Sequence, residues 1–263
     1  MADGWERDRE FMWDATRAVS VQMISALAPE PGDTILELAA GTGETGFAAA
    51  AVIGPEGRLI STDFSPEMVD AARRRAVELD LGNVDFRVMD AERNDLADGS
   101  VDGVLCRWGY MLMADPAAAL RETRRVLRDG KRLSFSVWGS PERNPWAAIP
   151  AAAMVSHGHM PPPEAGAPGI FAMGEAGRIR ELVTGAGFEN PEIEEVAVEY
   201  PYNDFDAYWR FIRQLAGALA MVIETLSDDQ REAVRETIRA EIEHYRAGDG
   251  YRLPGLALNA VTS

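Results

Sequence analysis

The order of apolar and polar residues divides the chain into short strands and amphipathic helices. Residues 34–39, 58–62, 84–88, 101–106 and 132–137 are brief apolar runs that predict buried strands. Helices are expected at 43–53, from Ser65 to about residue 79, and from Asp115 to about residue 127; the last two start with a capping side chain followed by proline. This alternation predicts an α/β fold, a doubly wound and mostly parallel sheet with helices on both faces.

The two ends of the chain differ from this alternating part. Residues 5–28 show helical spacing of their apolar positions. Residues 139–174 are rich in Pro, Gly and Ala and predict a long irregular connection. Further elements are expected as a helix at 175–187, a strand at 192–200, two aromatic-rich helices within 204–246, and a last strand at 256–261 that returns to the sheet edge.

Charge and composition narrow the classes of partner. The formal net charge is −17, which repels phosphate backbones and anionic membranes, so we expect no nucleic-acid partner. The basic run Arg73-Arg74-Arg75 fits a solvated helix face. No apolar run is long enough to span a bilayer, no apolar leader is visible, and a single cysteine, Cys106, excludes an internal disulfide, so we expect a cytoplasmic protein without stable membrane insertion.

A glycine-rich turn carries the strongest chemical signal. Gly41-Thr-Gly43-Glu-Thr-Gly46 follows a predicted strand and opens a helix, where backbone amides can approach a ligand closely. Taken alone, this string also fits a dinucleotide fingerprint. The neighbouring Glu37 favours a cofactor with cationic groups, such as the ammonium and sulfonium of S-adenosylmethionine, over a pyrophosphate. Asp63, at the end of the second strand, can accept hydrogen bonds from ribose hydroxyls, and Asp90 after the third strand can hold an adenine amino group.

With these residues in place, the chain resembles a class I S-adenosylmethionine-dependent methyltransferase, in the group of the ubiquinone/menaquinone-biosynthesis C-methyltransferases (methyltransferase type 11). Residues 35–43 resemble the first motif of the family, 62–68 its second, 90–92 and 98–102 its signature around the third and fourth strands, and 119–130 the segment before the fifth strand. The similarity is continuous over about residues 33–138. Ala39 and Lys131 stand where the family often has glycine, so the turn before the fifth strand is expected to differ.

The resemblance implies a seven-stranded Rossmann-like sheet with a helical lid. It divides the chain into an N-terminal helical segment (1–30), a cofactor-binding core (31–140), a loop plus the rest of the core (141–200), a helical lid insertion (201–250) and a last core strand (251–263). S-adenosylmethionine would be the cofactor and S-adenosylhomocysteine the product. The cofactor-binding residues would be Glu37, Ala39, Gly41, Thr42, Gly43, Asp63, Phe64, Met68, Asp90, Ala91 and Arg107, the last at the methyl-transfer mouth.

Several residues have a simpler interpretation beside the functional one. Glu37 could instead pair with Arg132 or a helix terminus. Trp108 and Tyr110 either line the acceptor site or belong to the core. No catalytic residue is firmly indicated; His157 and His159 are weak candidates for a base, and no set of metal ligands accompanies them. The aromatic residues between 200 and 211 fit a lid's own core better than a substrate box.

Three functions remain open at this point. Methyl transfer to an O, N or C atom of a small, partly apolar acceptor is favoured. A short-chain NAD(P)-dependent oxidoreductase would need a Tyr-x-x-x-Lys pair, and Leu127 precedes the only lysine, Lys131, at that distance. A non-catalytic protein that uses the same fold to bind a ligand is the other alternative. A homodimer is compatible with the sequence.

Overall fold

The computed structural model describes residues 9–164, 166–215 and 217–263. The strands are β1 (Thr34–Glu37), β2 (Arg58–Asp63), β3 (Val84–Val88), β4 (Val101–Arg107), β5 (Leu127–Trp138), β6 (Glu192–Tyr202), β7 (Arg246–Ala247) and β8 (Gly250–Thr262). The helices are α2 (Arg9–Leu27), α3 (Glu44–Ile53), α4 (Pro66–Glu78), α5 (Pro116–Val126), α6 (Pro145–Ser156), α7 (Ala176–Gly185), α8 (Phe205–Leu215), α9 (Ala218–Thr225) and α10 (Asp228–Ile242). The first residues of the predicted N-terminal helix, before residue 9, lie outside the described residues.

The main sheet has the order β3-β2-β1-β4-β5-β8-β6, with β7 paired to β8. Strands β1 to β5 run parallel to their neighbours, whereas β8 is antiparallel to both β5 and β6. The predicted doubly wound, mostly parallel sheet is therefore confirmed. The expectation that the last strand returns to the sheet edge is wrong, because β8 lies between β5 and β6 and leaves β6 at the edge.

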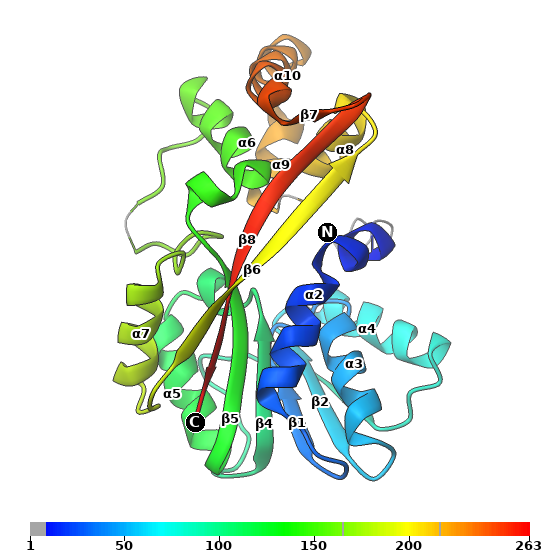
Figure 1. The fold of residues 1–263 in the computed structure, drawn as a ribbon, viewed down its shortest axis with the longest axis vertical. Coiled ribbons are helices and arrows are strands. Elements are labelled where there is room, and N and C mark those ends of the chain that lie inside the picture. Colours follow the sequence, from blue (N-terminus) through cyan, green and yellow to red (C-terminus); the bar gives the residue numbers. More distant parts are fainter. Residues whose placement is uncertain (1–8, 165, 216) are drawn as a thin grey trace.

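Helices cover both faces of the sheet, as Figure 1 shows. On one face α2 packs against β4, β5, β6 and β8 and against α3; on the other, α5 packs against α7. Side chains of alternate parity on the strands point to these two faces. Asn259 on β8 donates from Nδ2 to the carbonyl of Val19 in α2, while Phe135, of the opposite parity on β5, contacts Tyr110 on the α5 side. The central strands β1 and β4 are buried on both faces, as the apolar runs predict, whereas the edge strands β3 and β6 carry half-buried and exposed residues.

The helices that have local capping signals begin where the sequence predicts. Ser65 accepts a hydrogen bond from the Met68 amide and Pro66 is the first residue of α4. Asp115 caps α5 in the same way, through the Ala118 amide. The turn predicted before the fifth strand falls within β5, where Gly130 has a φ of 75° and Lys131 needs no unusual backbone conformation. Its ammonium instead lies 3.4 Å from an Asp33 carboxylate oxygen.

The segment 139–174 is less irregular than expected, because it contains the helix α6. Pro150 lies inside this helix and has no amide hydrogen to donate to the carbonyl of Trp146. The hydroxyl of Tyr208, from α8, donates to that carbonyl at 2.7 Å. A lid residue thus satisfies the group that the proline leaves without its helical partner.

The segment between β6 and β8, predicted from the sequence to be a lid and called the lid below, contains three helices among its described residues, α8, α9 and α10, where two were expected. Gly217, with φ 53°, separates the first two, and Ser227 begins the third with a capping box that includes Gln230. Figure 1 shows β6 and β8 as a long ribbon that rises beyond the other strands and carries these helices at its far end. Among the described residues, we find no helix of the length and apolar character needed to cross a membrane.

Candidate cofactor and acceptor site

The sheet order reverses beside β1, because β2 lies on one side of it and β4 on the other. In open α/β sheets, such a switch point leaves a crevice at the carboxyl ends of the strands. The loops after β1 and β4 approach each other here: a Cβ placed on Gly109 would lie 2.7 Å from that of Ala39. The predicted glycine turn therefore opens at this crevice.

Backbone hydrogen bonds hold the loop after β1 to both neighbouring strands. The Leu38 amide donates to the Leu105 carbonyl at 2.8 Å and the Ala40 amide to the Thr62 carbonyl at 2.9 Å. The loop has left-handed φ angles at Ala39 (50°), Gly41 (57°) and Gly43 (94°). A Cβ on Gly41 would meet no heavy atom within 4 Å, so this residue borders open space. Ala39 takes its conformation with a side chain, which costs about 1–2 kcal/mol.

Asp63 joins this loop to the start of α4. One carboxylate oxygen accepts from the Gly41 amide at 2.8 Å and the other from the Ser65 amide at 2.9 Å. Each oxygen keeps a further lone pair for a ligand. The half-buried carboxylate is thereby fixed beside the glycine turn, a bracing contact that the sequence interpretation did not include.

The carboxyl of Glu37 is buried beneath the same loop, with 2% of the residue exposed. It accepts a hydrogen bond from the Gly46 amide in the first turn of α3, at 2.7 Å. Burial raises the pKa of this carboxyl to about 8, and the Gly46 bond and the charge of Arg107 offset that effect only partly. The helix-terminus contact left open by the sequence is therefore present, whereas Arg132 donates elsewhere, to the Ala26 carbonyl.

Thr42 and Gly43 complete the turn. The Thr42 hydroxyl donates to a Glu44 carboxylate oxygen at 2.7 Å, and Gly43 is the residue before α3. A Cβ on Gly43 would lie 2.4 Å from the Phe47 ring, so only glycine fits at this position. Both side-chain and backbone constraints thus fix the shape of the turn that sequence analysis singled out.

The residues predicted to surround an adenine lie at the ends of β2 and β3, which are paired at Asp63 and Val88. Phe64 is 76% exposed, an unusual exposure for a large aromatic side chain. Met68 and Ala91 are half-buried, and Asp90 is exposed and accepts from the Glu92 amide. The structure therefore places all four near the same edge of the sheet.

Arg107 is the last residue of β4 and points under α2. Its guanidinium donates to Thr16 Oγ1 and Ser20 Oγ, both at 3.3 Å, and lies 4.7 Å from the ring centroid of Trp108. Burial lowers the pKa of Arg107, although Glu44 and Glu37 act in the opposite sense. Thr16 and Ser20 were not identified from the sequence; they are polar positions on the buried face of α2.

The remaining candidate site residues lie in different parts of the structure. Trp108 stacks on Trp138 with ring centroids 4.4 Å apart. Tyr110 is fully buried, and its hydroxyl is 2.7 Å from Thr123 Oγ1 of α5, which is the core position that the sequence left open. His157 is exposed and bonds to Thr237 of α10, with His159 stacked beside it. That contact ties the histidine pair to the lid.

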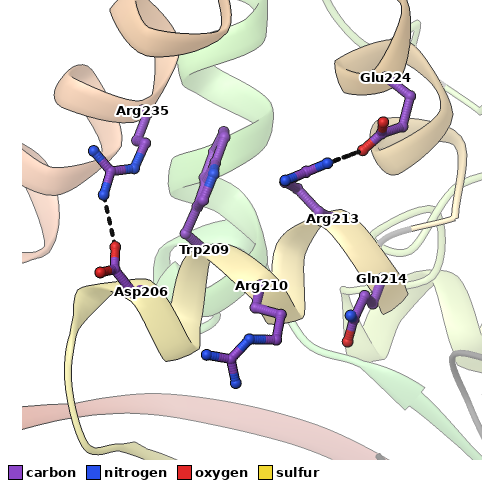
Figure 2. A pocket seen from close by; sticks show the side chains of 7 residues that line it. All are labelled: Asp206, Trp209, Arg210, Arg213, Gln214, Glu224 and Arg235. Carbon is purple, nitrogen blue, oxygen red and sulfur yellow. Dashed lines mark hydrogen bonds and ion pairs between the residues drawn. The ribbon is translucent and has the colours of Figure 1, made fainter. Parts of the chain in front are cut away.

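The lid carries a separate pocket of about 370 Å³, shown in Figure 2. Arg213 of α8 pairs with Glu224 of α9 at 2.6 Å, and Arg235 of α10 pairs with Asp206 at the start of α8. Arg210 points away from these pairs (Figure 2). The ion pairs connect the three lid helices, so we assign this pocket to lid structure.

The fold and site together define a Rossmann-like α/β protein with a glycine turn and acidic residues at its switch point. Residues 29–155 match the family model described as "Methyltransferase domain". This segment of the chain is similar to methyltransferase domains, and the chain shares its architecture with a solved S-adenosylmethionine-dependent methyltransferase.

Individual relatives agree with this assignment. The chain is 27% identical over 257 residues to the nocamycin O-methyltransferase of Saccharothrix syringae, covering 90% of this chain and 89% of the relative. It is 41% identical over 134 residues to a 37.1 kDa protein of transposon TN4556 from Streptomyces fradiae; this covers 49% of this chain and only about a third (36%) of the relative. A solved S-adenosylmethionine-dependent methyltransferase from Aquifex aeolicus has a similar fold, with a TM-score of 0.51 and 18% identity, covering 68% of this chain and 83% of that one.

Proposed function

We propose that the protein transfers a methyl group from S-adenosylmethionine to a small, partly apolar organic acceptor. The observation that carries this proposal is the arrangement at the switch point, where Gly41 borders open space and the carboxyl group of Glu37 and the carboxylate of Asp63 are fixed beside it. A pyrophosphate would meet these acidic groups at close range, whereas a nucleoside with cationic substituents complements them.

Each part of the cofactor has residues of matching chemistry. Glu37, Ala39, Gly41, Thr42 and Gly43 would surround the methionine part. Asp63 would accept hydrogen bonds from the ribose hydroxyls through its remaining lone pairs. The exposed face of Phe64, with Met68, would pack on the adenine, and Asp90 and Ala91 would contact its edge.

The proposed methyl transfer requires little covalent chemistry from the protein itself. When bound, S-adenosylmethionine supplies a methyl group that its sulfonium already activates. Arg107 and Trp108, at the end of β4, would line the space next to that methyl group. The chain's own contribution is to orient the acceptor and to exclude water beneath α2 and the lid. Turnover to S-adenosylhomocysteine with any small acceptor would distinguish this function from ligand binding alone.

Calorimetry on the full chain tests the cofactor assignment. We expect wild type to bind S-adenosylmethionine and not NAD, and Asp63→Ala to weaken binding at least tenfold, because charge-assisted hydrogen bonds contribute about 1.5–3 kcal/mol each. Asp70→Ala is the matched control, since Asp70 pairs with Arg73 on the exposed face of α4. Binding of NAD alone would refute the proposal, and equal affinity in Asp63→Ala would refute the ribose role of Asp63.

A further inference from the structure

The guanidinium of Arg107 is a half-buried positive charge without a carboxylate partner among the described residues. In the part of the chain that the structure describes, no carboxylate oxygen lies within 4.0 Å of it, and its hydrogen bonds reach only the hydroxyls of Thr16 and Ser20. Glu44 and Glu37 act on it from a greater distance. Buried charges are normally paired, so a ligand that supplies the counter-charge would complete this site.

Other hydrogen-bonding atoms beside Arg107 also have no partner among the described residues. These are Trp108 Nε1, Ser136 Oγ and the hydroxyl of Tyr200, all buried. Ser136 is the register partner of Arg107 on β5, and the charge of Arg107 acts on Tyr200. The indole and the guanidinium can only donate. Acceptor atoms of a ligand can therefore pair with these unused donors.

Aromatic rings surround these polar atoms. Trp138 stacks on Trp108, and Trp146 lies with its ring centroid 5.0 Å from that of Trp138 and 4.9 Å from that of Tyr200. Phe211 of the lid helix α8 closes the group, 5.8 Å from Tyr200. Flat apolar surfaces of this kind favour a planar aromatic ligand.

We propose that the methyl acceptor is an aromatic molecule that carries an oxyanion, and that Arg107, Tyr200 and Trp108 bind this oxyanion. This inference rests on the methyl transfer proposed above and names its substrate class. A protein of net charge −17 repels anions in general, so a half-buried arginine without a carboxylate partner gives the site its preference for them. On the side of α3, the acids Glu37 and Glu44 would face the cationic part of the cofactor instead.

A matched pair of probes tests the charge preference. We would titrate 3-hydroxy-2-naphthoate and 3-hydroxy-2-naphthamide, which share their rings and hydroxyl group, into the full chain saturated with S-adenosylhomocysteine. We expect the carboxylate to bind at least tenfold more tightly than the amide. Arg107→Met should abolish this preference and change the affinity for S-adenosylhomocysteine less than threefold, while Arg210→Met, at an exposed lid arginine, should retain it.

Two further variants keep the test independent of the folding of Arg107→Met. Tyr200→Phe and Trp108→Phe each retain a ring and lose one donor, so each should lower the affinity for the carboxylate severalfold and leave that for the amide unchanged. Equal binding of the two probes, or no carboxylate binding at millimolar concentration in protein loaded with S-adenosylhomocysteine, would overturn the inference alone. If Arg107→Met lost affinity for S-adenosylhomocysteine by the same factor as for the carboxylate probe, Arg107 would be assigned to the cofactor and the inference would be overturned. Failure of wild type to bind S-adenosylhomocysteine would overturn the proposed function and the inference together.

Discussion

The buried carboxyl of Glu37 makes the stability of the ligand-free protein depend on pH. Its pKa is about 8 in the folded protein and 4.5 as an ordinary value, because burial disfavours the charged form. Between these values, the native state keeps a proton that the unfolded chain has released. The stability from this carboxyl is therefore fully present below pH 4.5 and is lost as the pH rises through 8.

Glu37→Gln removes this dependence and keeps the local contact. The amide oxygen can still accept from the Gly46 amide, and the side chain no longer has a charge to bury. The pKa difference corresponds to a loss of roughly 3 kcal/mol of wild-type stability between pH 5 and pH 8. The variant should thus be more stable than wild type at pH 8, by an amount that shrinks toward pH 5, and should bind S-adenosylmethionine less tightly.

Urea unfolding at pH 5, 6, 7 and 8 measures this effect directly. The difference in the free energy of unfolding between Glu37→Gln and wild type should widen steadily with pH. Glu10→Gln, at an exposed position on α2, is the control and should show a constant difference. A difference for Glu37→Gln that stays constant across the series would refute the assignment of a raised pKa to this carboxyl.

Two further substitutions test packing around the site and the lid. Gly46→Ala should destabilise the protein by about 2 kcal/mol or more, because the new Cβ would lie 2.0 Å from Glu37 Oε2. The control Gly177→Ala, in an open position on α7, should leave stability unchanged or raise it by up to about 1 kcal/mol. Equal melting temperatures for the two variants would contradict this expectation. Tyr208→Phe should cost about 1–3 kcal/mol in urea unfolding, because the Trp146 carbonyl that Pro150 leaves unpaired loses its donor; a change below about 0.5 kcal/mol would show that water replaces the hydroxyl.

Local signals were sufficient to predict much of the core. The strand at Val84–Val88 has the predicted bounds, and the helices after Ser65 and Asp115 start as expected, because a capping side chain and a following proline act within a few residues. Elements that depend on tertiary contacts were predicted less well. Strand β5 begins five residues early, at Leu127, through pairing with Val101 across a shift in register.

The residues of the candidate site show the same difference between local signals and tertiary contacts. The glycine turn, Asp63 and Asp90 lie at or shortly after the carboxyl end of a strand, so a sequence pattern can place them at one sheet edge. The surroundings of Arg107 come from remote segments: Thr16 precedes it by 91 residues and Tyr200 lies on β6. No local pattern connects these positions, although Ser136, between the apolar residues Phe135 and Val137 of β5, is a polar residue at a buried position.

The position of β8 in the sheet affects how the protein folds while it is being synthesised. Among the described strands, β6 pairs only with β8, and β5 has β8 as its neighbour on that side. Until residues 250–262 have been made, a nascent chain therefore exposes one edge of β5 and the whole length of β6. Such unpaired edges promote association between chains. Expression conditions that slow the translation of residues 250–262 should thus increase aggregation, although the glycine turn after β1 has been synthesised long before.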